Sequence, residues 1–227
     1  MSILAIDTAL GATSVGVFER GTLHELSSRT VTMDKGHAEA LVPLVAEVMG
    51  EVEHGFAGLT KVAVTVGPGS FTGLRIGISA ARGFALARAI PVVGISTLAA
   101  YAAPQIATGE NSIVAAAIDA RHGEVYFQVF APGGRTMVGP AAMTVREAAR
   151  AIGSGPVRLV GSGAPMLAVE AWSLGVGATV VDGAVSPDIG WIARLGESAS
   201  GDQALPRPVY IKGVNATPQL ASALPRQ

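Results

Sequence analysis

The residues best placed to do chemistry surround a glycine turn in the first half of the chain. Gly67-Pro68-Gly69 ends the β-branched run KVAVTV at 61–66, and Ser70 or Thr72 can cap the helix predicted to follow. Backbone amides at a helix N-terminus carry partial positive charge, so such a turn can bind an anion. The alternative is a tight strand-to-helix joint without a ligand, because many glycine turns bind nothing.

Other polar groups could complete a phosphate site at this turn. In kinases an aspartate after a short apolar strand holds magnesium or assists the nucleophile, and arginines can bind phosphate. The alternatives are that an aspartate fixes the end of a strand by accepting backbone hydrogen bonds, and that exposed arginines are merely solvated or pair with a partner's carboxylates. The candidate phosphate- or nucleotide-contacting residues are Asp7, Thr8, Gly69, Ser70, Arg75 and Arg82.

Several catalytic classes lack their residues. The 227 residues include no cysteine, which removes thiolate zinc sites, cysteine nucleophiles and disulfides. The four histidines, His24, His37, His54 and His122, show neither HExxH nor HxxxH spacing, and neither a GxSxG elbow nor a P-loop motif is present. The residues therefore do not support these particular catalytic classes.

Composition narrows the class of protein further. The net charge is −1, and no run of Lys or Arg builds the basic face that a stand-alone nucleic-acid binder needs. Hydrophobic residues make up 49% and charged residues 15%, so an apolar patch reserved for a partner is expected. The chain shows no secretory signal and no membrane-length apolar run, and we expect a soluble cytoplasmic protein.

The elements that must position these residues occur twice in the same order. Each half is predicted to contain three strands, then helix, strand, helix, strand and helix, and Ala5-Ile6-Asp7 at the end of the first strand matches Ala117-Ile118-Asp119. For Asp119 we favour a structural role at the strand end. Two α/β lobes of this kind describe the RNase H-like architecture of actin, Hsp70 and the sugar kinases. The predicted domains are an N-terminal lobe at 1–105, a C-terminal lobe at 106–205 with a boundary near Pro104 to Glu110, and a C-terminal segment at 206–227 that can return to the first lobe.

Two helices of the first half carry patterns suited to close contact. An apolar stripe runs along the helix predicted between His37 and Gly50, and small residues recur every four positions in the helix after the glycine turn. Such faces either dock a partner or bury the helices in the monomer. The residues concerned are His37, Leu41, Leu44, Val45, Val48, Gly73, Gly77, Ala81 and Ala85.

Several stretches together resemble the TsaB (YeaZ) family. They are ILAIDTALGATSVGVF, GPGSFTGLRIGISAARGFA, PVVGISTLAA, AAIDARHGEVYFQVF and the late PVYIK, and they cover nearly the whole chain. The resemblance implies a non-catalytic scaffold that works with TsaD and TsaE to build threonylcarbamoyladenosine (t6A) in tRNA.

The resemblance also implies where the chemistry lies. The related catalytic subunit TsaD binds its metal through an HxxxH pair, and alignment places Thr97 and Tyr101 at those positions, where neutral hydroxyls do not hold a catalytic metal. ATP or ADP and the metal are thus expected in the partner subunits and not in this chain. The implied partners are a TsaD homologue bound through the two patterned helices, a TsaE homologue, a second copy of the chain, and tRNA only through the complex.

Two other functions remain open from the residues. A small-molecule or carbohydrate kinase of the same superfamily is suggested by Asp7-Thr8 and the two lobes. A metallopeptidase is the other alternative.

Overall fold

Two lobes, each built on a five-stranded mixed sheet, make up the computed structural model, which describes residues 1–201, 204 and 206–211. The first sheet has the order β3-β2-β1-β4-β5 and the second the order β10-β9-β6-β7-β8. The first sheet comprises β1 (Ser2–Asp7), β2 (Ala12–Glu19), β3 (Glu25–Thr32), β4 (Leu59–Gly67) and β5 (Val92–Ser96). The second comprises β6 (Ile113–Asp119), β7 (Glu124–Phe130), β8 (Thr136–Thr144), β9 (Val157–Val160) and β10 (Ala178–Asp182).

The two sheets share one topology. β1 pairs antiparallel with β2 and parallel with β4, and β6 pairs in the same way with β7 and β9. The helices are α1 (His37–Gly50), α2 (Phe71–Arg88), α3 (Thr97–Ala107), α4 (Val145–Ala151), α5 (Ala164–Ser173) and α6 (Ile189–Ser198), with short 3-10 turns at Gly55–Gly58 and Pro132–Gly134. This repeat is the predicted duplicated RNase H-like α/β fold, and the order of elements in each half is confirmed.

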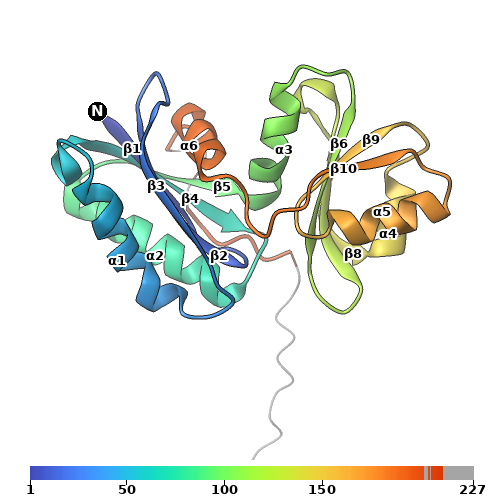
Figure 1. Cartoon of the computed structure of the whole chain (residues 1–227), viewed down its shortest axis with the longest axis horizontal. Coiled ribbons are helices and arrows are strands. Elements are labelled where there is room, and N and C mark those ends of the chain that lie inside the picture. Colours follow the sequence, from blue (N-terminus) through green and yellow to red (C-terminus); the bar gives the residue numbers. More distant parts are fainter. Residues whose placement is uncertain (202–203, 205, 212–227) are drawn as a thin grey trace, which may run out of the picture.

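Strand alternation divides the core of the first lobe into two layers. Leu4 and Ile6 of β1 pack with α1 and α2, while Ile3 and Ala5 point to the opposite face and pack with α6. In the second lobe α4 and α5 cover one face, and α3 covers the other. Figure 1 shows α6 and α3 in the space between the two sheets.

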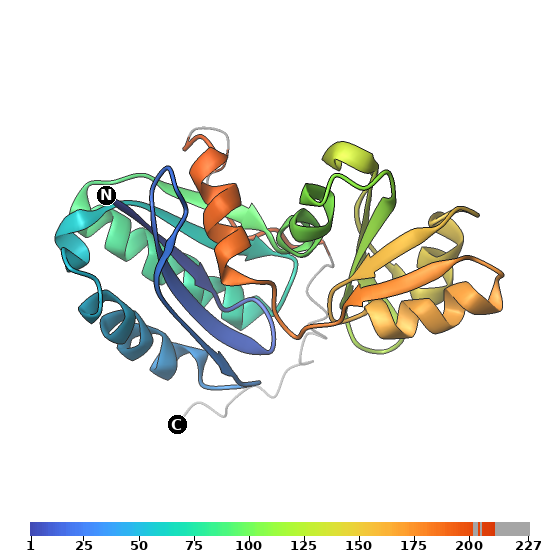
Figure 2. The ribbon, with the colours of Figure 1, turned by 45° about the horizontal axis from the view of Figure 1, so that its top comes forward.

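The two inner helices each pack on the sheet of the opposite half of the chain. α3 follows the first sheet in sequence and packs against β6, while α6 lies within the range predicted for the C-terminal lobe and packs on β1 and β4. The connection from β10 to α6 crosses between the lobes (Figure 2). The boundary predicted from Pro104 to Glu110 lies too late in the chain, because α3 already packs on the second sheet, beginning with Leu98.

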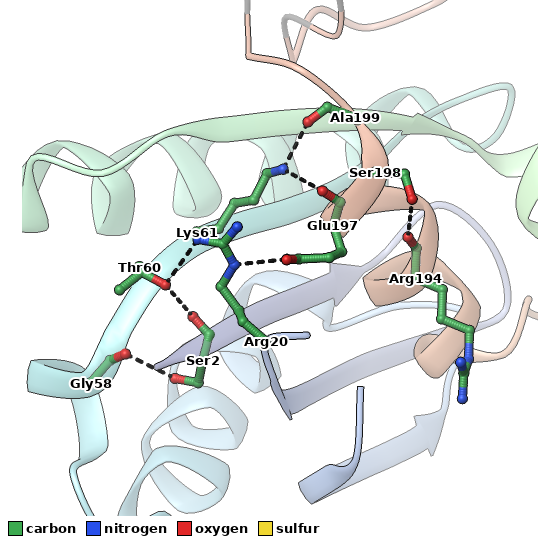
Figure 3. A network of polar contacts seen from close by, with 9 residues as sticks. All are labelled: Ser2, Arg20, Gly58, Thr60, Lys61, Arg194, Glu197, Ser198 and Ala199. Carbon is green, nitrogen blue, oxygen red and sulfur yellow. Dashed lines mark hydrogen bonds and ion pairs between the residues drawn. The ribbon is translucent and has the colours of Figure 1, made fainter. Parts of the chain in front are cut away.

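A polar network fastens the end of α6 to the first sheet (Figure 3). Lys61 of β4 is buried, and its Nζ donates to the carbonyls of Glu197 (3.0 Å) and Ala199 (2.7 Å). Arg20 Nε donates to Glu197 Oε2 at 2.8 Å, which holds the pKa of that carboxyl below its usual value. A cation at carbonyls that close a helix is favourable, so this cluster anchors α6.

Helix ends follow the expected capping in most places. Ser70 caps α2 through Gly73 N, as predicted, and Thr144 and Glu147 form a capping box at α4. Asp188 caps α6 by accepting from Gly190 N and Trp191 N. Within the described residues, no helix combines the length and apolar character needed to cross a membrane.

Candidate functional site between the lobes

The glycine turn after β4 packs directly on the loop after β1. Ser70 N donates to Ala9 O at 2.7 Å, and a Cβ on Gly69 would lie 2.4 Å from the same carbonyl oxygen. One amide of the turn therefore bonds to the protein's own backbone. The closest contact of the turn is with the same stretch of backbone. This arrangement is a strand-to-helix joint, the alternative to an anion site.

The small-residue row of α2 serves the same contact. Thr8 Oγ1 donates to Gly73 O at 2.7 Å, and a Cβ on Gly73 would lie 2.1 Å from Thr8 O. A Cβ on Gly77 would lie 2.5 Å from Thr8 Oγ1. The backbone that approaches α2 so closely is thus the chain's own β1 end.

The side chains expected to form the docking face are buried in the monomer. The stripe of α1 packs on the first sheet together with the inner face of α2, because both helices cover the same layer of strands. These residues cannot themselves contact a partner, and the prediction is corrected for His37, Leu41, Leu44, Val45, Val48, Gly73, Gly77, Ala81 and Ala85.

Asp7 is fully buried at the end of β1. Its Oδ1 accepts hydrogen bonds from Ala9 N (3.0 Å) and Thr65 Oγ1, whereas Oδ2 has no partner. Burial raises the pKa of Asp7 to about 6. Thr8 is also buried. Neither side chain can reach a nucleotide in this structure, so their predicted phosphate or magnesium contact is corrected to a structural role.

The second lobe repeats the aspartate turn in a more open form. Asp119 Oδ1 accepts from Arg121 N at 2.8 Å, and Asp119 N donates to Ser162 Oγ at 3.2 Å. Ser162 lies in a second glycine turn, Gly161 to Gly163, which leads from β9 into α5. The sequence analysis missed Arg121 and Ser162, although the glycine spacing after a strand was the available signal.

A cavity of about 590 Å³ lies where the two turns face each other. The lining contains one guanidinium, that of Arg121, and two carboxylates, those of Asp34 and Asp119. Its carboxylates outnumber its guanidinium, so this lining does not favour a polyanion such as a triphosphate. Its other polar groups include His37, whose Nδ1 lies 2.7 Å from Thr13 Oγ1 and whose pKa is lowered by burial. The lining residues are Ala9, Leu10, Gly11, Asp34, His37, Gly69, Ser70, Asp119, Ala120, Arg121, Tyr126, Ser162 and Val185.

The two candidate arginines of α2 do not enter this cavity. Arg75 lies 3.8 Å over the Phe71 ring and donates to Tyr210 Oη at 3.1 Å, and Arg82 donates to Pro206 O at 2.7 Å. Both hold the segment 206–211, which we call the C-terminal strap. Each arginine uses one N–H group on the strap and neither lines the cavity, so their predicted phosphate contact stays a prediction.

The C-terminal segment returns to the first lobe over its described part. Val209 N donates to Val66 O at 2.7 Å, beside the glycine turn. The expectation for 212–227 lies outside the described residues.

The two positions aligned with metal-binding histidines are both buried. Tyr101 Oη donates to Ala184 O at 3.0 Å, and burial raises the pKa of this phenol, so it stays neutral. Thr97 Oγ1 is buried without a hydrogen-bond partner. In the part of the chain that the structure describes, no three His, Asp or Glu side chains gather as metal ligands would.

Two RNase H-like lobes around a cleft define a protein of the class that contains sugar kinases, actin and Hsp70. The family model described as TsaD, tRNA N6-adenosine threonylcarbamoyltransferase, matches residues 28–166, from β3 to the start of α5. An uncharacterized protein of Mycobacterium tuberculosis is 38% identical over 164 residues, which are 72% of each chain.

Relatives with functional names point to the same family. The tRNA threonylcarbamoyladenosine biosynthesis protein TsaB of Escherichia coli is 40% identical over 130 residues, 56% of this chain and 54% of that protein. The structure of YeaZ from Pseudomonas aeruginosa is similar with a TM-score of 0.72 and 28% identity, covering 92% of this chain and 99% of that one. The chain belongs to the TsaB/YeaZ family.

Proposed function

We propose that this protein is a non-catalytic subunit in the formation of N6-threonylcarbamoyladenosine in cytoplasmic tRNA. It docks onto a catalytic TsaD homologue and acts with a TsaE homologue. The observation that carries the proposal is the pair Thr97 and Tyr101, because buried neutral hydroxyls stand at the positions aligned with metal-binding histidines. In this proposal the metal and ATP or ADP are bound by the partner subunits.

The cavity between the lobes supports the same division of labour. A kinase would need its strand-end carboxylate in contact with a magnesium–phosphate group. Asp7 is instead enclosed by protein, and the cavity wall contributed by the first lobe carries a carboxylate, Asp34, and no Lys or Arg. These features disfavour phosphoryl transfer by this chain.

The docking surface is the outer side of α1 and α2, opposite the buried stripe. Leu86 is 84% exposed and Val42 is 57% exposed, so each offers a large apolar side chain that the monomer leaves uncovered. Small residues surround them and allow another helix to approach closely. They are Ala38 and Ala46 on α1, and Gly83 and Ala87 on α2, all exposed. Without the TsaD homologue, the same surface can pair with a second copy of the chain.

Reconstitution tests the proposal. The purified chain, the TsaD and TsaE homologues of the same organism, tRNA and the remaining substrates are combined, and modified adenosine is quantified by mass spectrometry of nucleosides. Product is expected only when this chain is present together with its partners. Modification by this chain alone, or full modification in its absence, would contradict the proposal.

A pair of variants separates docking from folding. Leu86→Arg should abolish both the complex on size exclusion and the modification, because it places a charge at the centre of an apolar contact. Val169→Arg is the matched control, since Val169 is 63% exposed on α5 of the other lobe. Loss of activity in both variants alike would place the effect outside α2.

A further inference from the structure

The C-terminal strap is fastened along one side of α2. Arg82 holds it by Pro206 O, and the strap backbone pairs with the end of β4 through Val209 N and Val66 O, both at 2.7 Å. Gly67 has a φ of +115°, and a Cβ there would lie 2.7 Å from Val209 O. The turn residue is therefore shaped to the strap, which is an integral part of the first lobe.

The strap ends in an exposed apolar cluster whose side chains contact one another. The rings of Phe71 and Tyr210 are 5.2 Å apart between centroids, and Arg75 touches both, as a cation over the first ring and as a hydrogen-bond donor to the phenol. Phe71 is 41% exposed, Val209 43% and Tyr210 44%. Large side chains held in place but left half uncovered are typical of preorganised interface anchors. We call Phe71, Val209 and Tyr210 the strap patch.

We infer that the strap patch is a second docking element for the same catalytic partner, so that α2 is gripped on its outer side and along the strap side together. The inference rests on the proposed function. Its support is that the strap patch is continuous with the outer side of α2. Phe71 and Arg75 lie on the same helix, α2, as the exposed Leu86 of the outer side. A partner that covers the outer side of α2 meets the strap patch at the N-terminal end of that helix.

A nucleic acid is the less suitable occupant. Exposed aromatic rings can stack on bases, but binding of RNA depends mainly on cations that reach its phosphates. Arg75 and Arg82 each donate a hydrogen bond to the strap, and Arg207 is the one cation within the described strap, so the patch has few cations for its apolar area. With a net charge of −1 over the whole chain, an apolar protein surface fits this patch better.

Calorimetry with the full chain and the purified TsaD homologue tests the inference. Tyr210→Ala is expected to raise the dissociation constant at least about tenfold, and Val209→Ala several-fold. Truncation of a buried interface anchor has effects of this size. Val169→Ala makes the same chemical change at an exposed valine of the other lobe and should stay within about twofold. Tyr210→Phe keeps the ring and should bind nearly as the parent chain does.

A second readout does not depend on variants. Amide hydrogen exchange of peptides from the strap should slow when the partner is added to the unaltered chain, whereas peptides from α5 should not change. This measurement decides the matter if Tyr210→Ala fails to fold.

The outcomes separate the inference from the function. If Leu86→Arg abolishes binding while Val209→Ala and Tyr210→Ala bind as the parent does, the strap patch lies outside the interface and the proposed function stands. If the unaltered chain does not bind the TsaD homologue, both fall. If the strap variants keep partner affinity but weaken tRNA binding by the assembled complex, the patch is an RNA surface and the inference is wrong.

Discussion

The two lobes end their central strands with the same turn but enclose it differently. In each lobe an aspartate oxygen accepts the amide two residues further on, at 3.0 Å from Ala9 N to Asp7 and at 2.8 Å from Arg121 N to Asp119. Asp7 is fully buried and its pKa is raised to about 6, whereas Asp119 is half-buried at the cavity. The same turn is therefore buried in the first lobe and faces solvent in the second.

The helix that follows explains the difference. α2 brings Gly73 and Gly77 onto Thr8 and so closes over the first turn. In the second lobe the closest contact after β9 is made by Gly161, where a Cβ would lie 2.4 Å from Ala117 O. Ser162 Oγ then accepts a hydrogen bond from Asp119 N of the turn. The depth at which the helix packs decides whether a strand-end carboxylate is available to a ligand.

Forcing α2 away from the first turn should have the largest effect. Gly73→Ala places a Cβ 2.1 Å from Thr8 O, and since backbone cannot yield cheaply, we expect a loss of about 3 kcal/mol or more in unfolding free energy. Gly83→Ala, on the same helix with open space around it, should gain about 0.5–1 kcal/mol. Urea unfolding followed by circular dichroism measures both. Equal effects at the two glycines would refute close packing as the cause.

Releasing α6 from the first lobe should come next. Lys61→Met leaves the carbonyls of Glu197 and Ala199 without their donor, and we expect a loss of about 2 kcal/mol in unfolding free energy. Lys35→Met in an exposed loop is the control, expected to change stability by less than about 0.5 kcal/mol. Thermal melting at several salt concentrations should show the loss persisting, since the buried contact is poorly screened. A Lys61 variant as stable as the parent would mean that α6 is held by its apolar face alone.

Removing the buried charge should stabilise the protein. The folded pKa of Asp7, about 6, lies above the ordinary value of 3.8 for an aspartate, so the native state binds this proton more tightly than the unfolded state. Stability due to Asp7 therefore falls as pH rises from about 4 to about 6 and stays lower above it. Asp7→Asn keeps an acceptor for Ala9 N and should raise the unfolding free energy at pH 7.5 by about 1–2 kcal/mol, with less gain near pH 4. A destabilised variant at pH 7.5 would show that the carboxylate has a partner ion in solution.

The repeated elements could be predicted from the sequence because periodicity, caps and turns are local signals. The Ser70 cap, the Thr144 capping box and the matched strands ending at Asp7 and Asp119 all follow from residue types and spacing. The residues that pack against a patterned helix face, in contrast, are set by the tertiary structure and not by the local sequence. The row from Gly73 to Ala85 predicted a close neighbour, but only the tertiary structure shows that the neighbour is Thr8 of the same chain.

The candidate site was less predictable for the same reason. Arg75 and Arg82 have the spacing of a phosphate clamp, yet residues more than a hundred positions away accept a hydrogen bond from each. The cavity is lined by strand ends and loops from both halves, and Arg121 and Ser162 are brought together by the parallel pairing of β6 with β9. The sequence indicated the repeat through the order of elements and the match of Ala5-Ile6-Asp7 with Ala117-Ile118-Asp119, and neither signal points to Arg121 or Ser162.

The smallest effect is expected at the open member of the aspartate pair. Asp119→Asn preserves an acceptor for Arg121 N, and because the carboxylate already faces solvent, its charge costs little. Stability should change by less than about 0.5 kcal/mol at pH 7.5, a smaller change than that expected for Asp7→Asn. Parallel denaturant titrations of the two variants at pH 7.5 measure the contrast directly. If both variants shifted stability by the same amount, burial by α2 would not distinguish the two turns.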